Sequence, residues 1–206
     1  MTEGTGRTVR LDAVEARFAS GRVIGPVSVT IGPGLTHLVG PSGAGKSTLI
    51  RLICGEVRCG FGTVRVGGAD PFADASVRAS IGTLSTHPQL PGLFTVDEAW
   101  RWHAVVRGRP DWDGEALREA LGLPGGLRLD RASAGERQRA ELLAAVAGDP
   151  ALLLLDEPFS HLDVTAAAIL AGWLETWRAR TVIITGHAAL PMRVDRIWAP
   201  FDAAVP

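Results

Sequence analysis

The sequence contains no asparagine and no tyrosine, only two cysteines and a single lysine. Cys54 and Cys59 cannot form a disulfide framework and have no further Cys or paired His nearby for a metal site, so we expect them to pack as small apolar residues. No run of 18 apolar residues occurs, which excludes a membrane-spanning helix. The opening segment MTEGTGRTVRLD lacks the apolar core of a secretory signal, so a cytoplasmic location is expected.

The charge of the chain is almost balanced, with 22 acidic and 21 basic residues and a net charge of −1. This balance provides neither the basic surface of a nucleic-acid-binding protein nor a polybasic membrane anchor, so we expect no nucleic-acid partner. Hydrophobic residues make up 46% of the chain and charged residues 21%, which excludes a disordered chain. Residues 1–206 are therefore expected to form a single domain.

Apolar strand-like runs alternate with helical patterns, which predicts an α/β fold with a mostly parallel sheet flanked by helices. Capping-box patterns at Thr95 and Ser133 mark the starts of two helices. We expect the core to comprise about residues 1–85 and 141–206, with a small helical insert at about 86–140. The expected strands are Val27–Ile31, Leu35–Val39, Gly62–Val66, Ile81–Leu84, Ala151–Asp156 and Thr181–Thr185, and the expected helices cover 95–106, 115–121, 133–147 and 164–179.

One glycine-rich segment matches the G-x-x-x-x-G-K-[ST] pattern of a phosphate-binding loop and lies between an expected strand and an expected helix. Glycines allow close backbone approach and inward-pointing N–H groups, and the following helix directs its positive end at the same place. Lys46, the only lysine, would contact the β- and γ-phosphates, and the Ser47 hydroxyl would bind Mg²⁺. A chance glycine-rich turn is the alternative. The predicted nucleotide-binding residues are Gly40, Pro41, Ser42, Gly43, Ala44, Gly45, Lys46, Ser47 and Thr48.

Two acids, Asp156 and Glu157, follow the apolar run Leu152–Leu155. The carboxyl end of a parallel strand lies beside the phosphate loop, so Asp156 is predicted to hold Mg²⁺ directly or through water. Glu157 is predicted to be the general base that polarises the attacking water. Taken alone, the two acids are equally compatible with a solvated turn.

The run SAGERQR at Ser133–Arg139 begins 87 residues after Lys46 (133 − 46) and precedes the acidic strand end. It resembles the signature L-S-G-G-Q-x-Q-R of ABC-type ATPases, and the resemblance extends over about residues 18–187. It implies a P-loop NTPase domain with an antiparallel β subdomain and a small helical insert. It also implies ATP and Mg²⁺ as ligands, and a head-to-tail, ATP-dependent homodimer or heterodimer in which each signature covers the partner's ATP.

The resemblance assigns roles to further residues. Phe18 would stack on adenine, His187 would contact the γ-phosphate and orient the water, and Asp163 would lie in the loop that crosses the dimer interface. By residue type alone, Phe18 could be a core aromatic and His187 a satisfied loop histidine. The signature residues that would contact the partner's ATP are Ser133, Ala134, Gly135 and Glu136.

Three positions depart from the family pattern. Ala134 replaces a glycine where backbone meets phosphate. Glu136 replaces the usual glutamine, which completes a capping box with Ser133 but adds negative charge. The glutamine expected shortly after the strand at 81–84 is absent. The candidates for its role near the metal or water are Thr86, His87 and Gln89.

The resemblance predicts the ATP-hydrolysing subunit of an ABC-type transporter, working at the inner face of the cell membrane with a separate multi-span permease. The short chain without a carboxyl-terminal regulatory domain favours an exporter, and the Ser-Ala-Gly signature is similar to that of haem-exporter ATPases. A non-transport or regulatory ATP-binding module with weak hydrolysis is the alternative. A GTPase is excluded, because its N-K-x-D element needs an asparagine.

Tryptophans give two further expectations. Trp100 and Trp102 are two positions apart on an expected helix, so both cannot be buried on one face, and the exposed one would be a contact for the membrane partner. Trp173 and Trp177 have i,i+4 spacing, which favours packing against each other.

Overall fold

The computed structural model describes residues 6–17, 23–87, 89–160, 162–186 and 190–201. The strands are β1 (Val9–Arg17), β2 (Val23–Ile31), β3 (Gly34–Leu38), β4 (Phe61–Val66), β5 (Ile81–Leu84), β6 (Leu152–Leu155), β7 (Thr181–Thr185) and β8 (Arg196–Trp198). The helices are α1 (Lys46–Ile53), α2 (Ala75–Ala79), α3 (Val96–Val106), α4 (Glu115–Ala120), α5 (Ala134–Val146) and α6 (Val164–Glu175).

The central sheet has the strand order β5-β6-β7-β3-β8, and every neighbouring pair in it is parallel. All residues of β6 and β7 are buried, as expected for strands covered on both faces. Parallel neighbours require crossover connections, which the helices between these strands provide. The predicted α/β fold with a mostly parallel sheet flanked by helices is therefore confirmed.

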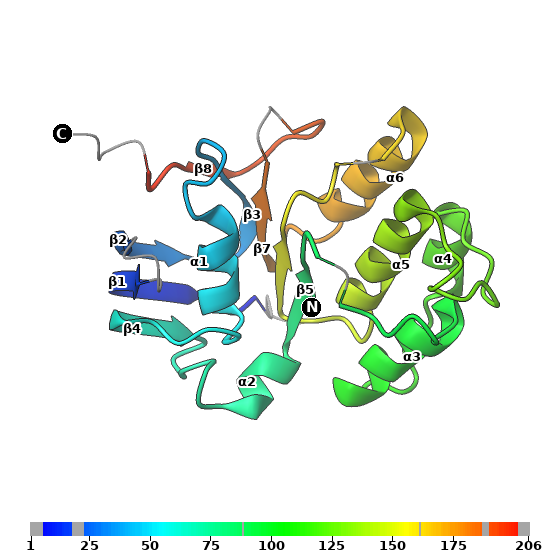
Figure 1. Cartoon of the computed structure of the whole chain (residues 1–206), viewed down its shortest axis with the longest axis horizontal. Coiled ribbons are helices and arrows are strands. Elements are labelled where there is room, and N and C mark those ends of the chain that lie inside the picture. The colour runs from blue at the N-terminus through cyan, green and yellow to red at the C-terminus, as the bar shows by residue number, and fades with distance from the viewer. Residues whose placement is uncertain (1–5, 18–22, 88, 161, 187–189, 202–206) are drawn as a thin grey trace.

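A second, antiparallel sheet of order β2-β1-β4 lies beside α1 on the left of Figure 1. Its buried side chains, among them Leu11 and Val64, pack with Leu49 of α1 and with Leu38 and Leu154 of the parallel sheet in one cluster. Helix α1 is therefore held between the two sheets. The expected antiparallel β subdomain is confirmed.

Helices α3, α4, α5 and α6 lie on the other side of the parallel sheet, on the right of Figure 1. A second buried cluster joins Trp100 of α3 and Leu143 of α5 to Leu153 and Leu155 of β6. The remaining β6 side chains belong to the first cluster, so alternation along one strand connects the two cores. In the part of the chain that the structure describes, no helix is both long and apolar enough to cross a bilayer.

The last helix is shorter than the sequence predicts, because α6 ends at Glu175 rather than at residue 179. The Thr176 hydroxyl donates a 2.6 Å hydrogen bond to the carbonyl of Trp173, and the chain then turns. This turn buries the Trp177 ring, which packs against Trp173 with 4.6 Å between ring centroids and lies under the guanidinium of Arg180. Burial of a large aromatic ring stabilises the fold more than one further turn of helix would.

Three elements, β1, α2 and β8, were not predicted. The apolar alternation of β1 is interrupted by a register shift between Leu11 and Val14, where Ala13 has φ 47°. A bulge of this kind hides a strand from a search for strict alternation. Helix α2 has five residues and begins at the N-cap Asp74, and β8 has three residues. Both are too short to show a hydrophobic period.

Cys54 and Cys59 are free thiols that are partly buried at the margin of the first cluster. Burial raises the pKa of the Cys54 thiol to about 11, so this group stays protonated and unreactive near neutral pH. Their packing agrees with the sequence-based expectation of small apolar side chains.

Candidate nucleotide-binding site

The loop between β3 and α1 depends on glycine for its shape. Gly43 and Gly45 have φ 72° and 116°, in the left-handed region that favours glycine. A Cβ atom at Gly45 would lie 2.4 Å from Cδ1 of Ile24 on β2. The loop leads into α1, whose first turn contains no acidic residue. The positive end of the helix dipole is therefore available to an anion bound in the loop.

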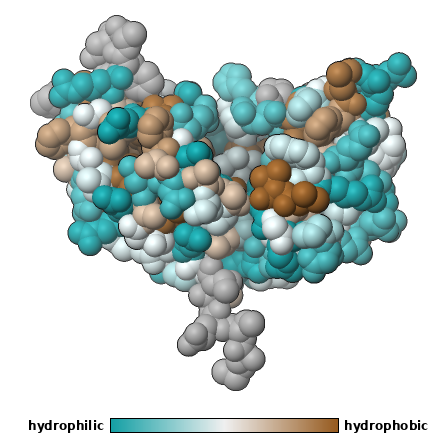
Figure 2. Space-filling model, turned by 90° about the horizontal axis from the view of Figure 1, so that it is seen from below, coloured by the Kyte–Doolittle hydropathy of each residue, from teal (hydrophilic) through white to brown (hydrophobic). Residues whose placement is uncertain are grey.

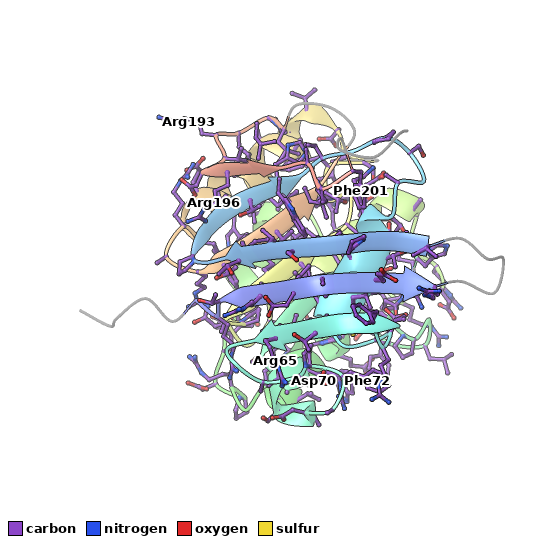
Figure 3. All side chains as sticks on the ribbon, turned by 90° about the vertical axis from the view of Figure 1, so that its left-hand side faces the viewer. Arg65, Asp70, Phe72, Arg193, Arg196 and Phe201 are labelled. Carbon is purple, nitrogen blue, oxygen red and sulfur yellow. The ribbon has the colours of Figure 1, made fainter. Side chains whose placement is uncertain are left out.

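Lys46 is the first residue of α1 and is only 5% exposed. Its Nζ donates hydrogen bonds of 2.8 Å to the carbonyl of Gly40 and 3.1 Å to that of Pro41. The ring of Phe201, labelled in Figure 3, also approaches this loop, because a Cβ at Gly40 would lie 2.9 Å from its Cδ2. The ammonium is thus held across the loop, where phosphate oxygens would be stronger acceptors for the same donors.

Ser47 and Asp156, the two residues predicted to hold Mg²⁺, line one cavity of about 390 Å³. Ser47 comes from the start of α1, and Asp156 directly follows β6 and is 4% exposed. A hydroxyl and a carboxylate are hard oxygen donors, which suit a Mg²⁺ ion that keeps water and phosphate ligands. Among the described residues, no group of three or more His, Cys, Asp or Glu could hold a metal ion by itself. The oxygen donors of Ser47 and Asp156 have the chemistry that a Mg²⁺ site would use.

Thr185, which the sequence analysis did not single out, joins Asp156 to Glu157. Its hydroxyl donates a 2.6 Å hydrogen bond to Oδ1 of Asp156. The Thr185 hydroxyl oxygen in turn accepts a 2.9 Å hydrogen bond from the backbone N–H of Glu157. Thr185 is fully buried at the end of β7, so it fixes the orientation of the Asp156 carboxylate.

Glu157 has φ 55°, a left-handed conformation that is uncommon outside glycine. Its carbonyl accepts a 2.7 Å hydrogen bond from the Ser160 hydroxyl. Nε2 of Gln138 on α5 lies 3.5 Å from that carbonyl, 3.2 Å from the carbonyl of Pro158 and 3.4 Å from Oγ of Ser160. Side chains therefore hold the backbone of Glu157 on both sides, with Thr185 at its N–H.

A second cavity of about 400 Å³, which Glu157 lines, shares the start of the loop after β5 and Asp156 with the first. Thr86 borders both cavities, whereas His87 and Gln89 border only the one that contains Ser47. The Thr86 hydroxyl lies 3.3 Å from Nδ1 of His87, and the Gln89 side chain donates to the carbonyl of His87 at 3.2 Å. Of the three candidates for the missing glutamine, Thr86 is the one placed between the predicted metal ligands and the predicted base.

The signature segment forms the predicted capping box at the start of α5. The N–H and hydroxyl of Ser133 donate to Oε2 of Glu136 at 2.8 and 2.6 Å. These two hydrogen bonds lower the pKa of the Glu136 carboxyl from its usual value, and the bond from the hydroxyl has the larger effect. The Ser133 hydroxyl, which was expected to meet the partner's phosphate, thus already donates to a carboxylate. Gly135 is partly buried, whereas Ala134 is exposed and lines the second cavity.

Asp163, predicted to lie in the interface loop, is the N-cap of α6, and its side chain accepts a 2.8 Å hydrogen bond from the N–H of Ala166. The next residue, Val164, is 88% exposed. The predicted adenine-stacking residue Phe18 and the predicted γ-phosphate contact His187 lie outside the described residues.

Comparisons with known proteins identify related sequences and structures. The family model described as ABC transporter matches residues 24–160. The chain is 36% identical to the lipoprotein-releasing system ATP-binding protein LolD of Anaeromyxobacter dehalogenans, over 96% of this chain and 92% of that protein. It is 38% identical to the sulfate/thiosulfate import ATP-binding protein CysA of Mycolicibacterium paratuberculosis, over 79% of this chain. It spans about half the length of the CysA relatives that it matches.

A solved structure of a bacterial Atm1-family ABC exporter with ATP bound is also similar, with 26% identity and a TM-score of 0.74 over 89% of this chain and 35% of that one. The matched family region contains the phosphate loop, the signature segment and the acidic end of β6. ATP-binding subunits of this family are ATPases. The chain therefore belongs to the ABC transporter family, as one of its ATP-binding subunits.

Proposed function

We propose that the chain hydrolyses MgATP at the phosphate loop and couples hydrolysis to substrate movement through a separate membrane protein. The observation that carries this proposal is the placement of Ser47, Asp156 and Glu157 around two cavities that share Asp156, the first of which is lined by the start of α1. An oxygen-donor pair for the metal and a residue that can activate water are thus close neighbours, as phosphoryl transfer requires.

Each residue has a distinct task in this proposal. Lys46 exchanges its two carbonyl partners for β- and γ-phosphate oxygens. Ser47 and Asp156 would hold Mg²⁺, which would neutralise charge on the phosphates. Glu157 accepts a proton from the water that attacks the γ-phosphorus, while the bond to ADP breaks. Thr185 keeps both carboxyl-bearing residues oriented.

We further propose that two subunits, identical or different, pair head to tail across two ATP molecules. The start of α5, with Ser133 and Ala134, and the start of α6, with Asp163 and Val164, are exposed and would face the partner. The anion preference of a helix start supports contact between α5 and the partner's phosphates. His187 and Phe18 would complete each site, at the γ-phosphate and the adenine.

The membrane partner that we propose is a multi-span permease that docks on α3 at the inner face of the membrane. Trp100 of this helix is 4% exposed, whereas Trp102, Val105 and Val106 are 51%, 58% and 49% exposed and share one helical face. The expectation that one of the two neighbouring tryptophans is exposed is thus confirmed. Figure 2, which views the lower side of Figure 1, includes an apolar patch over the region of α3. Exposed apolar patches of this kind mark interaction sites.

We propose export as the direction of transport. Support comes from the 36% identity to the lipoprotein-releasing relative over 92% of that protein. The alternative is a regulatory module with weak hydrolysis, and Thr86 at the position of the expected glutamine favours it. A turnover that stays low even with the permease in a membrane would decide for the alternative.

The central test is ATP hydrolysis by the purified chain. We expect magnesium-dependent turnover that Lys46→Ala abolishes, because the phosphates lose their fixed charge. Glu157→Gln is expected to retain ATP binding and to accumulate as a dimer in gel filtration with MgATP. Unchanged turnover in Lys46→Ala would contradict the assigned site, and a strictly monomeric Glu157→Gln variant would contradict the ATP sandwich.

The docking surface is tested separately. Trp102→Glu and Val105→Glu are expected to abolish co-purification with the permease while basal ATP hydrolysis persists. Phe61→Glu is the matched control, since Phe61 is 63% exposed on β4 in the other sheet. Equal loss of the permease in all three variants would refute docking on α3.

A further inference from the structure

Side chains contact both hydrogen-bonding groups of the Glu157 backbone, and the backbone N–H of Ser160 also donates to the Glu157 carbonyl at 3.1 Å. The N–H donates to Thr185 of β7, and the carbonyl accepts from Ser160 in the following loop. The third contact is Nε2 of Gln138, which reaches the carbonyls of Glu157 and Pro158 and Oγ of Ser160. These contacts surround a non-glycine residue with φ 55°, a conformation that persists only when its surroundings impose it.

Gln138 lies on α5, five positions after the N-cap Ser133. One end of this helix carries the exposed signature residues, and little more than one turn later its side chain meets the backbone of Glu157. Gln138, Ala134 and Glu157 also line the same cavity. The start of α5 and the carboxylate-bearing loop are thus connected directly by one amide side chain.

We propose that Gln138 is a positioning residue, through which the signature helix α5 sets the backbone of Glu157 for the chemical step. The proposal rests on the proposed function, in which Glu157 is the general base. Displacement of α5 by the partner's nucleotide would be transmitted to Glu157 by this amide, without any contact between Gln138 and the reacting atoms. The Ser160 hydroxyl donates to the same Glu157 carbonyl and has the same positioning role.

The test compares three variants of the full chain. Gln138→Leu removes the amide and its donors but keeps a side chain of similar bulk. Ser160→Ala removes the 2.7 Å bond from the hydroxyl to the Glu157 carbonyl and leaves the 3.1 Å bond from the Ser160 N–H. Both are expected to lower kcat about 10- to 100-fold, the range caused by small misplacement of a catalytic group. KM for ATP is expected to stay within about twofold, because the phosphate loop is untouched.

Ser80→Ala is the matched control. The Ser80 hydroxyl makes the same bond to a carbonyl three residues earlier, that of Val77, also at 2.7 Å, at the end of α2. We expect its kcat to equal that of the wild type. The double variant Gln138→Leu/Ser160→Ala is expected to lose less than the product of the two single losses, since both act on one carbonyl.

If Gln138 only stabilised the fold, its replacement would also weaken ATP binding or the dimer. In the Glu157→Gln background, adding Gln138→Leu is expected to leave the ATP-dependent dimer unchanged in gel filtration. Loss of that dimer, a parallel rise in KM, or kcat values within about twofold of wild type in both Gln138→Leu and Ser160→Ala would overturn the proposal. Failure of the proposed function is distinguishable, because the wild type itself would then lack turnover.

Discussion

The hydroxyl of Thr185 bridges Asp156 and Glu157, as a donor to the Asp156 carboxylate at 2.6 Å and an acceptor from the Glu157 N–H at 2.9 Å. A hydroxyl has one proton and two lone pairs, so a single side chain can serve both neighbours at once. The contact follows from strand register, because Leu155 of β6 pairs with Ile184 of β7 and the next residues of both strands therefore meet. The orientation of the proposed metal ligand thus depends on the end of the neighbouring strand.

Thr185→Val is expected to lower Mg²⁺-dependent ATP hydrolysis about 10- to 100-fold, the usual cost of removing a partner that orients a metal ligand. The side chain keeps its shape, but Asp156 loses a donor and the Glu157 N–H loses its acceptor. The measurement is turnover as a function of magnesium concentration, with a weaker apparent affinity for the ion expected.

Thr36→Val serves as the control for this prediction. Thr36 is a buried threonine on β3, and its hydroxyl has no hydrogen-bond partner among the described residues. Its replacement is expected to leave magnesium dependence unchanged, since no bond is lost. A similar shift in both variants would mean that burial of a methyl group, rather than the bridge, explains the effect.

Gly45→Ala is expected to abolish ATP binding and to lower the melting temperature. Gly45 has φ 116°, and a Cβ there would approach Ile24 to 2.4 Å, so the loop or β2 has to move. Gly172→Ala, within α6, is the counterpart, because nothing lies within 4 Å of the added methyl. Alanine stabilises a helix interior by about 0.5–1 kcal/mol relative to glycine. Thermal unfolding with and without ATP measures both, and a tolerated Gly45→Ala would refute the steric argument.

The sequence predicted the parts of the site that are contiguous in the chain. The phosphate loop and the acidic end of β6 have fixed spacing and residue types that carry their own chemistry. The contacts of Thr185 with Asp156 and of Gln138 with Glu157 were not predicted, since they join residues 29 and 19 positions apart in the chain. A threonine at the end of an apolar strand shows no pattern by itself, and its role becomes visible only through the register of the sheet.

The same limit applies to the fold. Helices opened by capping boxes were placed well, because both boxes are local and both form as expected, Thr95 with Glu98 and Ser133 with Glu136. The predicted end of α6 was wrong, because burial of Trp177 is a tertiary effect that no local sequence pattern shows. Strand β1 was not predicted because its bulge at Ala13 breaks the alternation on which recognition of a strand relies.

Glu136→Gln is expected to strengthen the ATP-dependent dimer. The carboxylate accepts from both donors of Ser133 at the start of α5, where the proposed function places the partner's phosphate. Glutamine keeps an acceptor for the capping box and removes the negative charge that repels phosphate. The dimer is measured by sedimentation in the Glu157→Gln background at low and moderate salt, and the gain is expected to shrink as salt screens the charge.

A second capping box supplies the control for this charge effect. Glu98 accepts from the N–H and hydroxyl of Thr95 at 2.8 and 3.0 Å, at the start of α3. Glu98→Gln makes the same chemical change at a helix start outside the proposed sandwich, so the dimer should not respond. Equal strengthening in both variants would point to net charge, and no change in Glu136→Gln would argue against phosphate at α5.

His103 on α3 is expected to make the fold sensitive to acid. Burial, with a smaller contribution from the nearby charge of Arg107, lowers the pKa of this imidazole to about 4 from a usual 6.5. The unfolded chain therefore takes up a proton first as the pH falls, and stability declines between about pH 6.5 and pH 4, by at most about 3 kcal/mol. His103→Phe removes the titrating group, so urea unfolding of this variant should depend less on pH in that window.

Glu141 is expected to affect the pH dependence of stability in the opposite direction. Burial raises the pKa of its carboxyl, against the opposing effect of hydrogen bonds from the N–H groups of Leu90 and Gln89. The native state then binds the proton more readily than the unfolded chain, so this residue adds stability at low pH that is lost as the pH rises above about 4.5. Glu141→Gln should therefore steepen the decline in acid that His103→Phe flattens. Identical pH profiles for the wild type and both variants would show that neither group carries the acid response.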